Sequence, residues 1–120
     1  MKREYQLGMY EKAVPKELTW QEKARAARDA GFDFIELSVD ETDDKLARLN
    51  WTKEERAEVL KIAQDEGMPF RSMCLSGHRK YPIGSEDEAT CARGMEIMEQ
   101  ALELSCDLGI RMIQLAGYDV

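Results

Sequence analysis

At 120 residues the chain is long enough for one domain, and a hydrophobic content of 43% is sufficient for a core. The formal net charge of −7 argues against nucleic-acid binding, which needs a basic surface, so any anion site must be local. No apolar run is long enough to span a membrane, and the N-terminal MKREYQLGMY lacks the apolar core of a signal peptide.

The elements predicted along the chain alternate between strands and helices. Short apolar runs at residues 5–10, 32–39, 68–76 and 110–117 are typical of buried strands. Three amphipathic segments lie between them, and their starts, 33 residues apart each time, are Thr19-Trp-Gln-Glu22, Thr52-Lys-Glu-Glu55 and Ser85-Glu-Asp-Glu88. Each start has the pattern of a capping box, and a glycine ends each segment at Gly31, Gly67 and Gly109. This order predicts an α/β fold with a parallel sheet in a single domain over residues 1–120.

The predicted helices carry apolar stripes that we interpret as core. These are Trp20, Ala24 and Ala27 in the first, Val59, Leu60 and Ala63 in the second, and Met95, Met98, Ala101, Leu102 and Leu108 in the third. The cysteines Cys74, Cys91 and Cys106 have no CxxC spacing, so we interpret them as free packing residues. Free thiols suit a reducing, cytoplasmic location.

The two longest connections, residues 39–51 and 76–84, both follow strands. They therefore lie at the carboxyl ends of the strands, where α/β folds bind ligands. Long loops after strands and short loops after helices are typical of a barrel enzyme. The acidic segment from Asp40 to Asp44 does not fit a calcium-binding loop, so we expect a solvated loop there.

Alternation along the predicted strands gives the sheet two different sides. One side is aliphatic in every strand and should face the helices; its residues are Leu7, Met9, Ile35, Leu37, Met73, Leu75, Ile113 and Leu115. The other side becomes small or polar, with Gln6, Tyr10, Glu36, Ser76 and Gln114. A flavodoxin-like sheet covered on both faces should be apolar on both sides, and no glycine-rich phosphate loop is present, so this alternative is disfavoured.

Two residues have competing interpretations. Glu36 is either a carboxylate paired with a neighbouring arginine or lysine, or a polar group aimed into a ligand site. His78, the only histidine, lies in the loop SGHRKYPIGS beside Arg79 and Lys80, where it could contact an anionic sugar or be structural. A metal-ligand role for His78 is disfavoured because no second ligand lies at a suitable spacing.

Four segments in order along the chain closely resemble the start of the L-ribulose-5-phosphate (L-xylulose-5-phosphate) 3-epimerases: LGMYEKAVP, FDFIELSVDETDDKLARLNW, SMCLSGHRKYPIGS and LGIRMIQLAGYDV. This family, with the older name hexulose-6-phosphate isomerase, belongs to the xylose-isomerase-like TIM barrels. The resemblance covers Leu7 to Val120. Because an eight-stranded barrel needs about 250 residues, it implies that this chain is the N-terminal half, about half a barrel.

The resemblance implies a sugar-phosphate epimerase that converts L-ribulose 5-phosphate to L-xylulose 5-phosphate by proton transfer at C3 through an enediolate. In the family a divalent metal (Mn, Mg or Zn) holds the sugar oxygens, and its ligands come from later strands. We therefore expect no catalytic and no metal-binding residue in this chain, and no activity from it alone. Strand alternation and loop position instead predict substrate-binding residues, namely Tyr10, Glu36, Ser76, His78 and Gln114, with Arg79 and Tyr118 as further candidates.

A different class of function also fits the sequence. Four parallel strands that do not close into a barrel leave two open sheet edges, which invite pairing with another chain. The alternative is therefore a non-catalytic half-barrel that assembles with another chain, including a homo-oligomer. In neither case do we expect a nucleic-acid or membrane partner.

Overall fold

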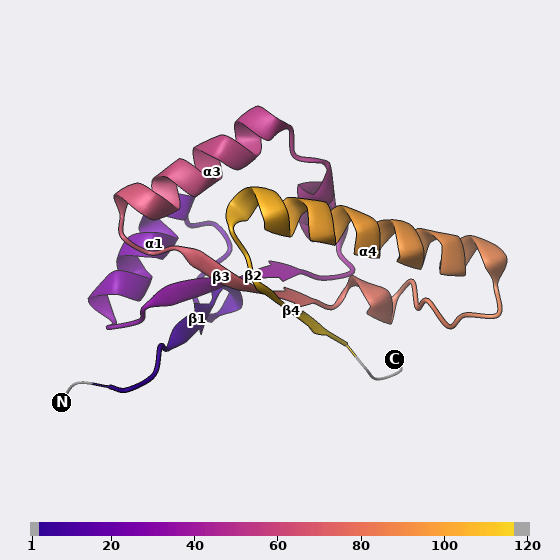
Figure 1. Ribbon diagram of the computed structural model, residues 1–120, viewed down its shortest axis with the longest axis horizontal. Helices are drawn as coiled ribbons and strands as arrows, with labels where there is room; N and C mark the ends of the chain where they lie inside the picture. The colour runs from indigo at the N-terminus through magenta and orange to yellow at the C-terminus, as the bar shows by residue number, and fades with distance from the viewer. Residues whose placement is uncertain (1–2, 117–120) are drawn as a thin grey trace.

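The computed structural model describes residues 3–116 as four strands and four helices, which alternate along most of the chain (Figure 1). The strands are β1 (Gly8–Tyr10), β2 (Phe34–Val39), β3 (Phe70–Leu75) and β4 (Met112–Leu115). The helices are α1 (Trp20–Asp29), the short α2 (Asp43–Leu46), α3 (Lys53–Asp65) and α4 (Glu88–Leu108). Three short 3₁₀ turns complete the fold: η1 (Glu11–Ala13), η2 (Ala47–Asn50) and η3 (Gly77–Arg79).

The four strands form one parallel sheet in the sequential order β1-β2-β3-β4, as predicted. Helices α1, α3 and α4 lie together on one side of this sheet, and no described helix covers the other side (Figure 1). A flavodoxin-like sheet has its first strand inside the sheet and helices on both faces. Sequential order with helices on one side is instead the arrangement of consecutive units in a barrel.

Helix ends explain why β2, β3 and β4 each begin two residues after their predicted start. The last turn of each long helix closes through a glycine with positive φ, at 89° for Gly31, 67° for Gly67 and 74° for Gly109. The next backbone N–H then bonds back into the helix, from Phe32 to Ala27, Met68 to Ala63 and Ile110 to Ser105. This is the Schellman pattern, so these apolar residues complete the helix instead of starting the strand.

Two of the three predicted capping boxes are confirmed. Thr19 and Glu22 bond each other's backbone N–H groups at the start of α1, and Thr52 and Glu55 do the same at α3. The third prediction is wrong, because α4 is capped by Asp87, whose carboxylate accepts from the backbone N–H of Thr90 at 2.9 Å. Ser85 lies two residues before Asp87 and accepts a hydrogen bond from its backbone N–H, so the Ser85 hydroxyl is not the helix cap.

The hydrophobic core lies between the sheet and the helices. The aliphatic strand residues fill it as predicted, with exposed fractions of 3% or less for Met9, Ile35, Leu37, Met73 and Leu75. The predicted stripes of α1 and α3 also pack there through Trp20, Ala24, Ala27, Val59, Leu60 and Ala63. Burial of such side chains contributes about 1.5–3 kcal/mol each, so this layer is the main source of stability.

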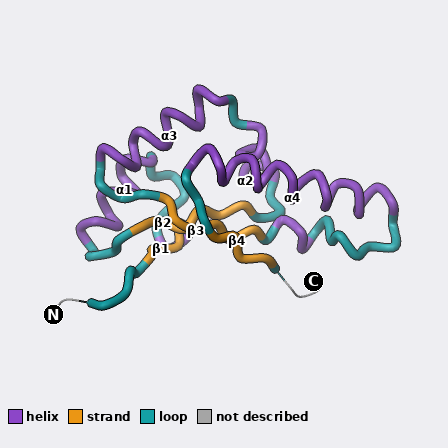
Figure 2. The backbone as a smooth tube through the Cα atoms, in the orientation of Figure 1, coloured by secondary structure: helices purple, strands orange, loops and turns teal. Residues whose placement is uncertain are grey.

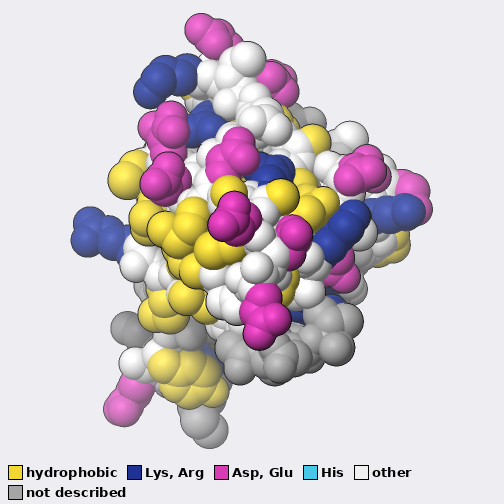
Figure 3. Space-filling view, turned by 90° about the vertical axis from the view of Figure 1, so that its right-hand side faces the viewer, with side chains coloured by type: hydrophobic (Ala, Val, Ile, Leu, Met, Phe, Trp, Pro, Cys, Tyr) yellow, Lys and Arg dark blue, Asp and Glu magenta, His cyan; other side chains and the backbone are white. Residues whose placement is uncertain are grey.

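The predicted core contained several residues that the structure leaves exposed. Met95 and Leu102 of α4 are 46% and 52% exposed, because the helix turns a different row, including Ile97 and Leu104, toward the sheet. Leu7 and Leu115 are 42% and 52% exposed at the ends of the edge strands, and Cys106 is exposed on α4. Figure 3 views the molecule from the right-hand side of Figure 1, and apolar side chains gather among charged ones on the surface that it shows.

Within residues 3–116 no helix is both long and apolar enough to cross a membrane. The loop between β3 and α4 is the longest stretch without regular helix or strand apart from its η3 turn (Figure 2). The predicted loop 39–51 instead folds into α2, which packs against β2, and η2, which packs against α4.

Candidate functional site

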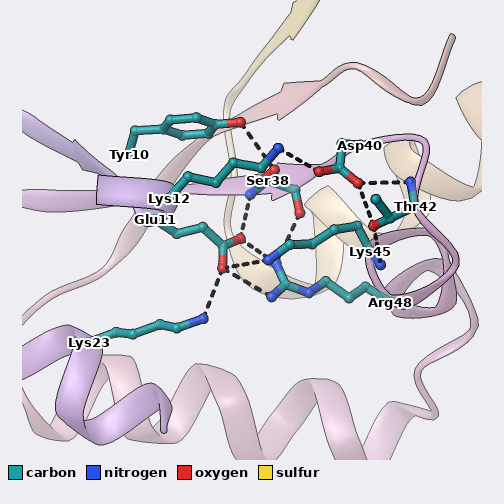
Figure 4. Close-up of polar contacts among 9 residues, drawn as sticks. All are labelled: Tyr10, Glu11, Lys12, Lys23, Ser38, Asp40, Thr42, Lys45 and Arg48. Carbon is teal, nitrogen blue, oxygen red and sulfur yellow. Dashed lines mark hydrogen bonds and ion pairs between the residues drawn. The ribbon is translucent and has the colours of Figure 1, made fainter. Parts of the chain in front are cut away.

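Polar side chains gather where β1 and β2 end, at the carboxyl edge of the sheet (Figure 4). Tyr10 is the last residue of β1, and Glu11 and Lys12 follow it in η1. Ser38 lies near the end of β2, and Asp40 follows that strand. Parallel strands bring their carboxyl ends to one edge, so residues 28 positions apart become neighbours.

Glu11 is the centre of a buried ionic cluster. Its side chain is 1% exposed, and its Oε1 accepts a hydrogen bond from the backbone N–H of Ser38 at 2.6 Å. Lys23 of α1 and Lys45 of α2 place their Nζ atoms 3.1 and 3.3 Å from its Oε2. Arg48 of η2 donates from both terminal nitrogens, its Nη1 to Oε1 and its Nη2 to Oε2. One carboxylate thus connects β2 and three helical segments to the end of β1.

Three cations around a single carboxylate determine its protonation. Burial alone would raise the pKa of Glu11, but the hydrogen bond and charge of Arg48, the Ser38 N–H and the charge of Lys45 outweigh it and lower the pKa to about 2. The pKa of Lys45 is lowered, mainly because burial disfavours its charged form. The cluster therefore keeps an ionised glutamate and an excess of positive charge at the end of β1.

A second ion pair joins the two loops beside this cluster. Lys12 Nζ lies 2.5 Å from Asp40 Oδ2, and Thr42 donates to Asp40 Oδ1 from its hydroxyl at 2.6 Å and from its N–H at 2.9 Å. The hydrogen bond with Asp40 raises the pKa of Lys12. Burial opposes ionisation of Asp40, but Lys12 and Thr42 outweigh it and lower its pKa. The prediction of a solvated acidic loop is therefore wrong for Asp40, which is 6% exposed.

These two groups border a pocket of about 370 Å³. The pocket is lined by four lysines, three acids and two other residues: Lys12, Lys16, Lys23, Lys45, Glu11, Asp40, Asp44, Val14 and Thr42. Arg48 adds a further positive charge behind Glu11. The pocket is thus a local cationic site in a chain whose formal net charge is −7. Its size is within the range of pockets that bind small molecules.

The open face of the sheet carries two hydrogen-bonded pairs. Tyr10 donates its hydroxyl to Ser38 Oγ at 3.1 Å, and Ser72 donates to Glu36 Oε2 at 2.5 Å. Burial raises the pKa of the Tyr10 hydroxyl, so it is a neutral donor near pH 7. Glu36 makes no ion pair with an arginine or lysine of residues 3–116, so the interpretation of Glu36 as half of a salt bridge is not supported. Tyr10 and Glu36 are the half-buried members of these pairs, whereas Ser38 and Ser72 are buried.

The predicted site residues do not all gather in one place. Tyr10 and Glu36 are half-buried neighbours on β1 and β2 and are register partners. Ser76 is buried just after β3, and its backbone N–H bonds to Val39. Gln114 is exposed on β4, opposite Cys74 in the register. Tyr118 lies outside the described residues, and no contact is assigned to it.

His78 lies on the helix side of its loop and contacts α4. It is 8% exposed, and its Nε2 is 2.9 Å from the backbone carbonyl oxygen of Gly94. Arg79, the next residue, lies 3.9 Å from Glu41 Oε1. The contact with α4 anchors the loop after β3. A substrate contact by His78 stays a prediction, and the bond to Gly94 does not favour it.

Sequence reasoning missed Glu11 and Arg48. Glu11 follows Tyr10 directly, so alternation places it on the aliphatic, helix-facing side of the sheet, where a charged residue interrupts the pattern. That interruption was the available signal. Arg48 gave none, because its position in the folded chain depends on the course of α2 and η2.

Residues 3–116 contain no group of three or more histidine, cysteine, aspartate or glutamate side chains that could hold a metal ion. Glu11 and Asp40, the two buried acids at the carboxyl edge of the sheet, instead form ion pairs with arginine and lysine. The described residues therefore do not fit a divalent metal.

Curated proteins similar to this chain are named as L-ribulose-5-phosphate 3-epimerases. It is 54% identical over 114 residues to L-ribulose-5-phosphate 3-epimerase UlaE of Escherichia coli K12, a match over 95% of this chain and 40% of that protein. It is 52% identical over 118 residues to the putative L-ribulose-5-phosphate 3-epimerase SgbU of Haemophilus influenzae, a match over 98% of this chain and 41% of that protein. The chain thus spans about two fifths of the length of these curated relatives.

Solved structures share the fold at low sequence identity. A D-psicose 3-epimerase superposes with a TM-score of 0.75 and 22% identity over 93% of this chain and 37% of that chain. The 3-keto-D-glucoside 4-epimerase YcjR of E. coli gives a TM-score of 0.68 and 23% identity over 90% of this chain and 36% of that chain. Residues 24–120 match the family model of the xylose isomerase-like TIM barrel. The chain therefore belongs to the xylose isomerase-like TIM barrel family.

Proposed function

We propose that this chain is the N-terminal half of a sugar-phosphate 3-epimerase that interconverts L-ribulose 5-phosphate and L-xylulose 5-phosphate. The observation that carries this proposal is the 54% identity to L-ribulose-5-phosphate 3-epimerase UlaE over nearly the whole chain. The reaction requires removal and return of the C3 proton on opposite faces of the sugar. We propose that the acid, the base and the ligands of a divalent metal lie outside residues 3–116, where no metal-binding cluster is found.

In this proposal the chain supplies part of the substrate wall. Tyr10 and Glu36 lie side by side on the uncovered face of the sheet, with Ser76 at the end of β3 and Gln114 on β4. A neutral hydroxyl and a carboxylate are the groups that bind sugar hydroxyls as donor and acceptor. His78 is retained as a substrate-contact candidate only if its loop detaches from Gly94, to which it now bonds.

The lysine-lined pocket is where we propose that the phosphoryl group binds. The net charge of −7 repels a phosphate at long range, so binding needs a concentrated local cationic site. The pocket joins Lys12, Lys16, Lys23 and Lys45 at the carboxyl edge of the sheet, and three acids, Glu11, Asp40 and Asp44, also line it. Inorganic phosphate titrated into the protein should change the fluorescence of Trp20, whose ring lies 4.5 Å from Lys23 Nζ.

The experiment for the proposed reaction is a chimera of this chain with the remaining part of E. coli UlaE. We expect turnover of L-ribulose 5-phosphate with Mn²⁺ by the chimera and none by the 120-residue chain alone. Tyr10→Phe in the chimera should reduce kcat/KM by about tenfold, the size of one lost hydrogen bond to substrate. Tyr5→Phe is the matched control, because Tyr5 is 66% exposed outside the sheet. A folded chimera without turnover would contradict the proposal, as would activity of the isolated chain.

A second proposed function is assembly with another chain through open sheet edges. In the described sheet β1 and β4 each pair on one side only, and Met112 and Leu115 of β4 are 67% and 52% exposed. Unpaired edge groups and exposed apolar side chains favour association. Light scattering at micromolar concentration tests this alternative, since a monomeric mass would count against it. For either function we propose a cytoplasmic location, which free cysteines suit.

A further inference from the structure

β1 is shorter than β2 at the carboxyl edge of the sheet. The last register pair between them joins Tyr10 to Glu36, and Ser38 lies two residues beyond it. Residues of a parallel ladder bond to the neighbouring strand through both N–H and C=O. β1 therefore ends before it reaches Ser38, and the Ser38 main chain has no strand partner on the β1 side.

Two side chains take the place of the missing strand. Glu11 Oε1 accepts from the Ser38 N–H at 2.6 Å, and Arg48 Nη1 donates to the Ser38 carbonyl oxygen at 2.9 Å. Arg48 also donates to Glu11, so the two side chains form a single bridge along the main chain of Ser38 (Figure 4). The bridge is 1% exposed at Glu11 and 11% at Arg48, and the Arg48 guanidinium lies 5.0 Å from the ring centre of Trp20.

Ser38 connects this bridge to the other side of the sheet. Its hydroxyl accepts from Tyr10 at 3.1 Å on the open face, while its backbone is held by Glu11 and Arg48. Tyr10 and Glu11 are consecutive residues, so the end of β1 contacts Ser38 from both sides of the sheet. A shift of the Ser38 main chain would move the partner of the Tyr10 hydroxyl.

We propose that Glu11 and Arg48 are positioning residues for Tyr10: by replacing the missing strand beside Ser38, they fix the hydroxyl to which Tyr10 is bonded. That Tyr10 faces a substrate rests on the proposed function, whereas the positioning itself does not. Charge balance alone does not require this geometry. Lys23 and Lys45 already neutralise Glu11, yet Arg48 spans both Glu11 oxygens and the Ser38 carbonyl.

The test uses the 120-residue chain labelled at tyrosine Cζ with ¹³C, with the Tyr10 signal assigned by its loss in Tyr10→Phe. Ser38→Ala gives the position of that signal when the hydrogen bond is absent. Arg48→Lys keeps the charge but loses the planar fork that binds Glu11 and Ser38 together. Arg56→Lys is the matched control, because buried Arg56 also pairs with an acid, Asp107, and donates to a backbone carbonyl, that of Leu49.

We expect Arg48→Lys to move the Tyr10 signal toward its position in Ser38→Ala, and Arg56→Lys to leave it in place. The double variant of Arg48→Lys with Ser38→Ala should show no further shift, because both changes remove the same contact. The proposal is overturned if folded Arg48→Lys keeps the wild-type signal, if Arg56→Lys shifts it equally, or if the two shifts add.

A second variant, Glu11→Gln, tests the proposal if Arg48→Lys does not fold. Glu11→Gln keeps an oxygen for the Ser38 N–H but weakens its bond to Arg48, so we expect a smaller Tyr10 shift in the same direction. If Arg48→Lys does not fold, an unshifted Tyr10 signal in folded Glu11→Gln overturns the proposal. Turnover separates the two proposals: if Arg48→Lys moves the Tyr10 signal but leaves kcat/KM of the UlaE chimera unchanged, the positioning stands and the substrate role of Tyr10 fails.

Discussion

Two parts of the carboxyl edge hold their loops by different means. Beside β1 and β2 the loops are held by charges, with Glu11 bound by three cations and Asp40 paired with Lys12. Beside β3 the loop lies against the backbone of α4, where a Cβ at Gly94 would meet the carbonyl oxygen of Tyr81 at 2.5 Å, and His78 bonds the carbonyl oxygen of Gly94 at 2.9 Å. The first part has an excess of buried charge, and the second depends on the absence of a side chain on α4.

The difference shows which perturbations each part should resist. A buried ion cluster is sensitive to removal of one charge and to protonation, and tolerates changes of volume at its open pocket. A close backbone contact is sensitive to a single added methyl group.

Glu11→Ala should lower the free energy of unfolding by about 3–5 kcal/mol, because it leaves buried cations without their shared partner. Urea unfolding followed by circular dichroism measures this loss. Glu58→Ala is the control, since Glu58 is exposed on α3, and its effect should be within about 0.5 kcal/mol. Equal effects of the two variants would show that the cluster does not stabilise the edge.

Acid should weaken the β1–β2 part selectively. The pKa of Glu11 is about 2 in the folded protein against its ordinary value of 4.5, so its contribution is complete above the higher value and is lost as the pH falls toward the lower one. That gap corresponds to about 3 kcal/mol. Urea unfolding at stepped pH should therefore show a smaller acid-dependent loss in Glu11→Gln than in wild type. Parallel pH curves for the two proteins would contradict the assignment.

Gly94→Ala should destabilise the β3–α4 part by about 2 kcal/mol through overpacking. A Cβ atom at Gly94 would lie 2.5 Å from the carbonyl oxygen of Tyr81 and 3.2 Å from the backbone N of Ile83. Gly84→Ala, where a Cβ meets nothing within 4 Å, is the matched control and should change thermal stability little.

The smallest expected effect is at the start of α4. Asp87→Ala should cost about 1 kcal/mol, because it removes the cap that accepts from Thr90. Ser85→Ala should cost less, since its hydroxyl accepts only from the backbone N–H of Asp87 two residues on. Thermal unfolding of both variants ranks their losses of stability. A larger loss in Ser85→Ala would support Ser85, the residue predicted from the sequence, as the helix cap.

Local signals predicted most of the fold. The capping boxes at Thr19 and Thr52 and the glycines after each helix were correct because caps form between residues a few positions apart. Alternation correctly placed Ile35 and Met73 in the core. The predicted stripe failed at Met95 and Leu102, because adjacent rows of α4 are both apolar and only the sheet decides which is buried.

The candidate site could be predicted only in part. Strand alternation correctly put Tyr10 and Glu36 on the same open face as register partners. It could not reveal that Asp40 pairs with Lys12, or that His78 turns toward α4, because both depend on how a loop packs. Arg48 was missed entirely, since a surface arginine and a buried one look alike in sequence.

The sequence by itself determined the order of the strands and helices, the caps of α1 and α3, and the two unlike sides of the sheet. These follow from hydrogen bonds and apolar periodicity among residues close along the chain. Only the tertiary structure decided the ionic cluster, because Glu11 meets Lys23, Lys45 and Arg48 across 12, 34 and 37 positions. Such contacts exist only once β1 and β2 are paired and the helices have packed behind them.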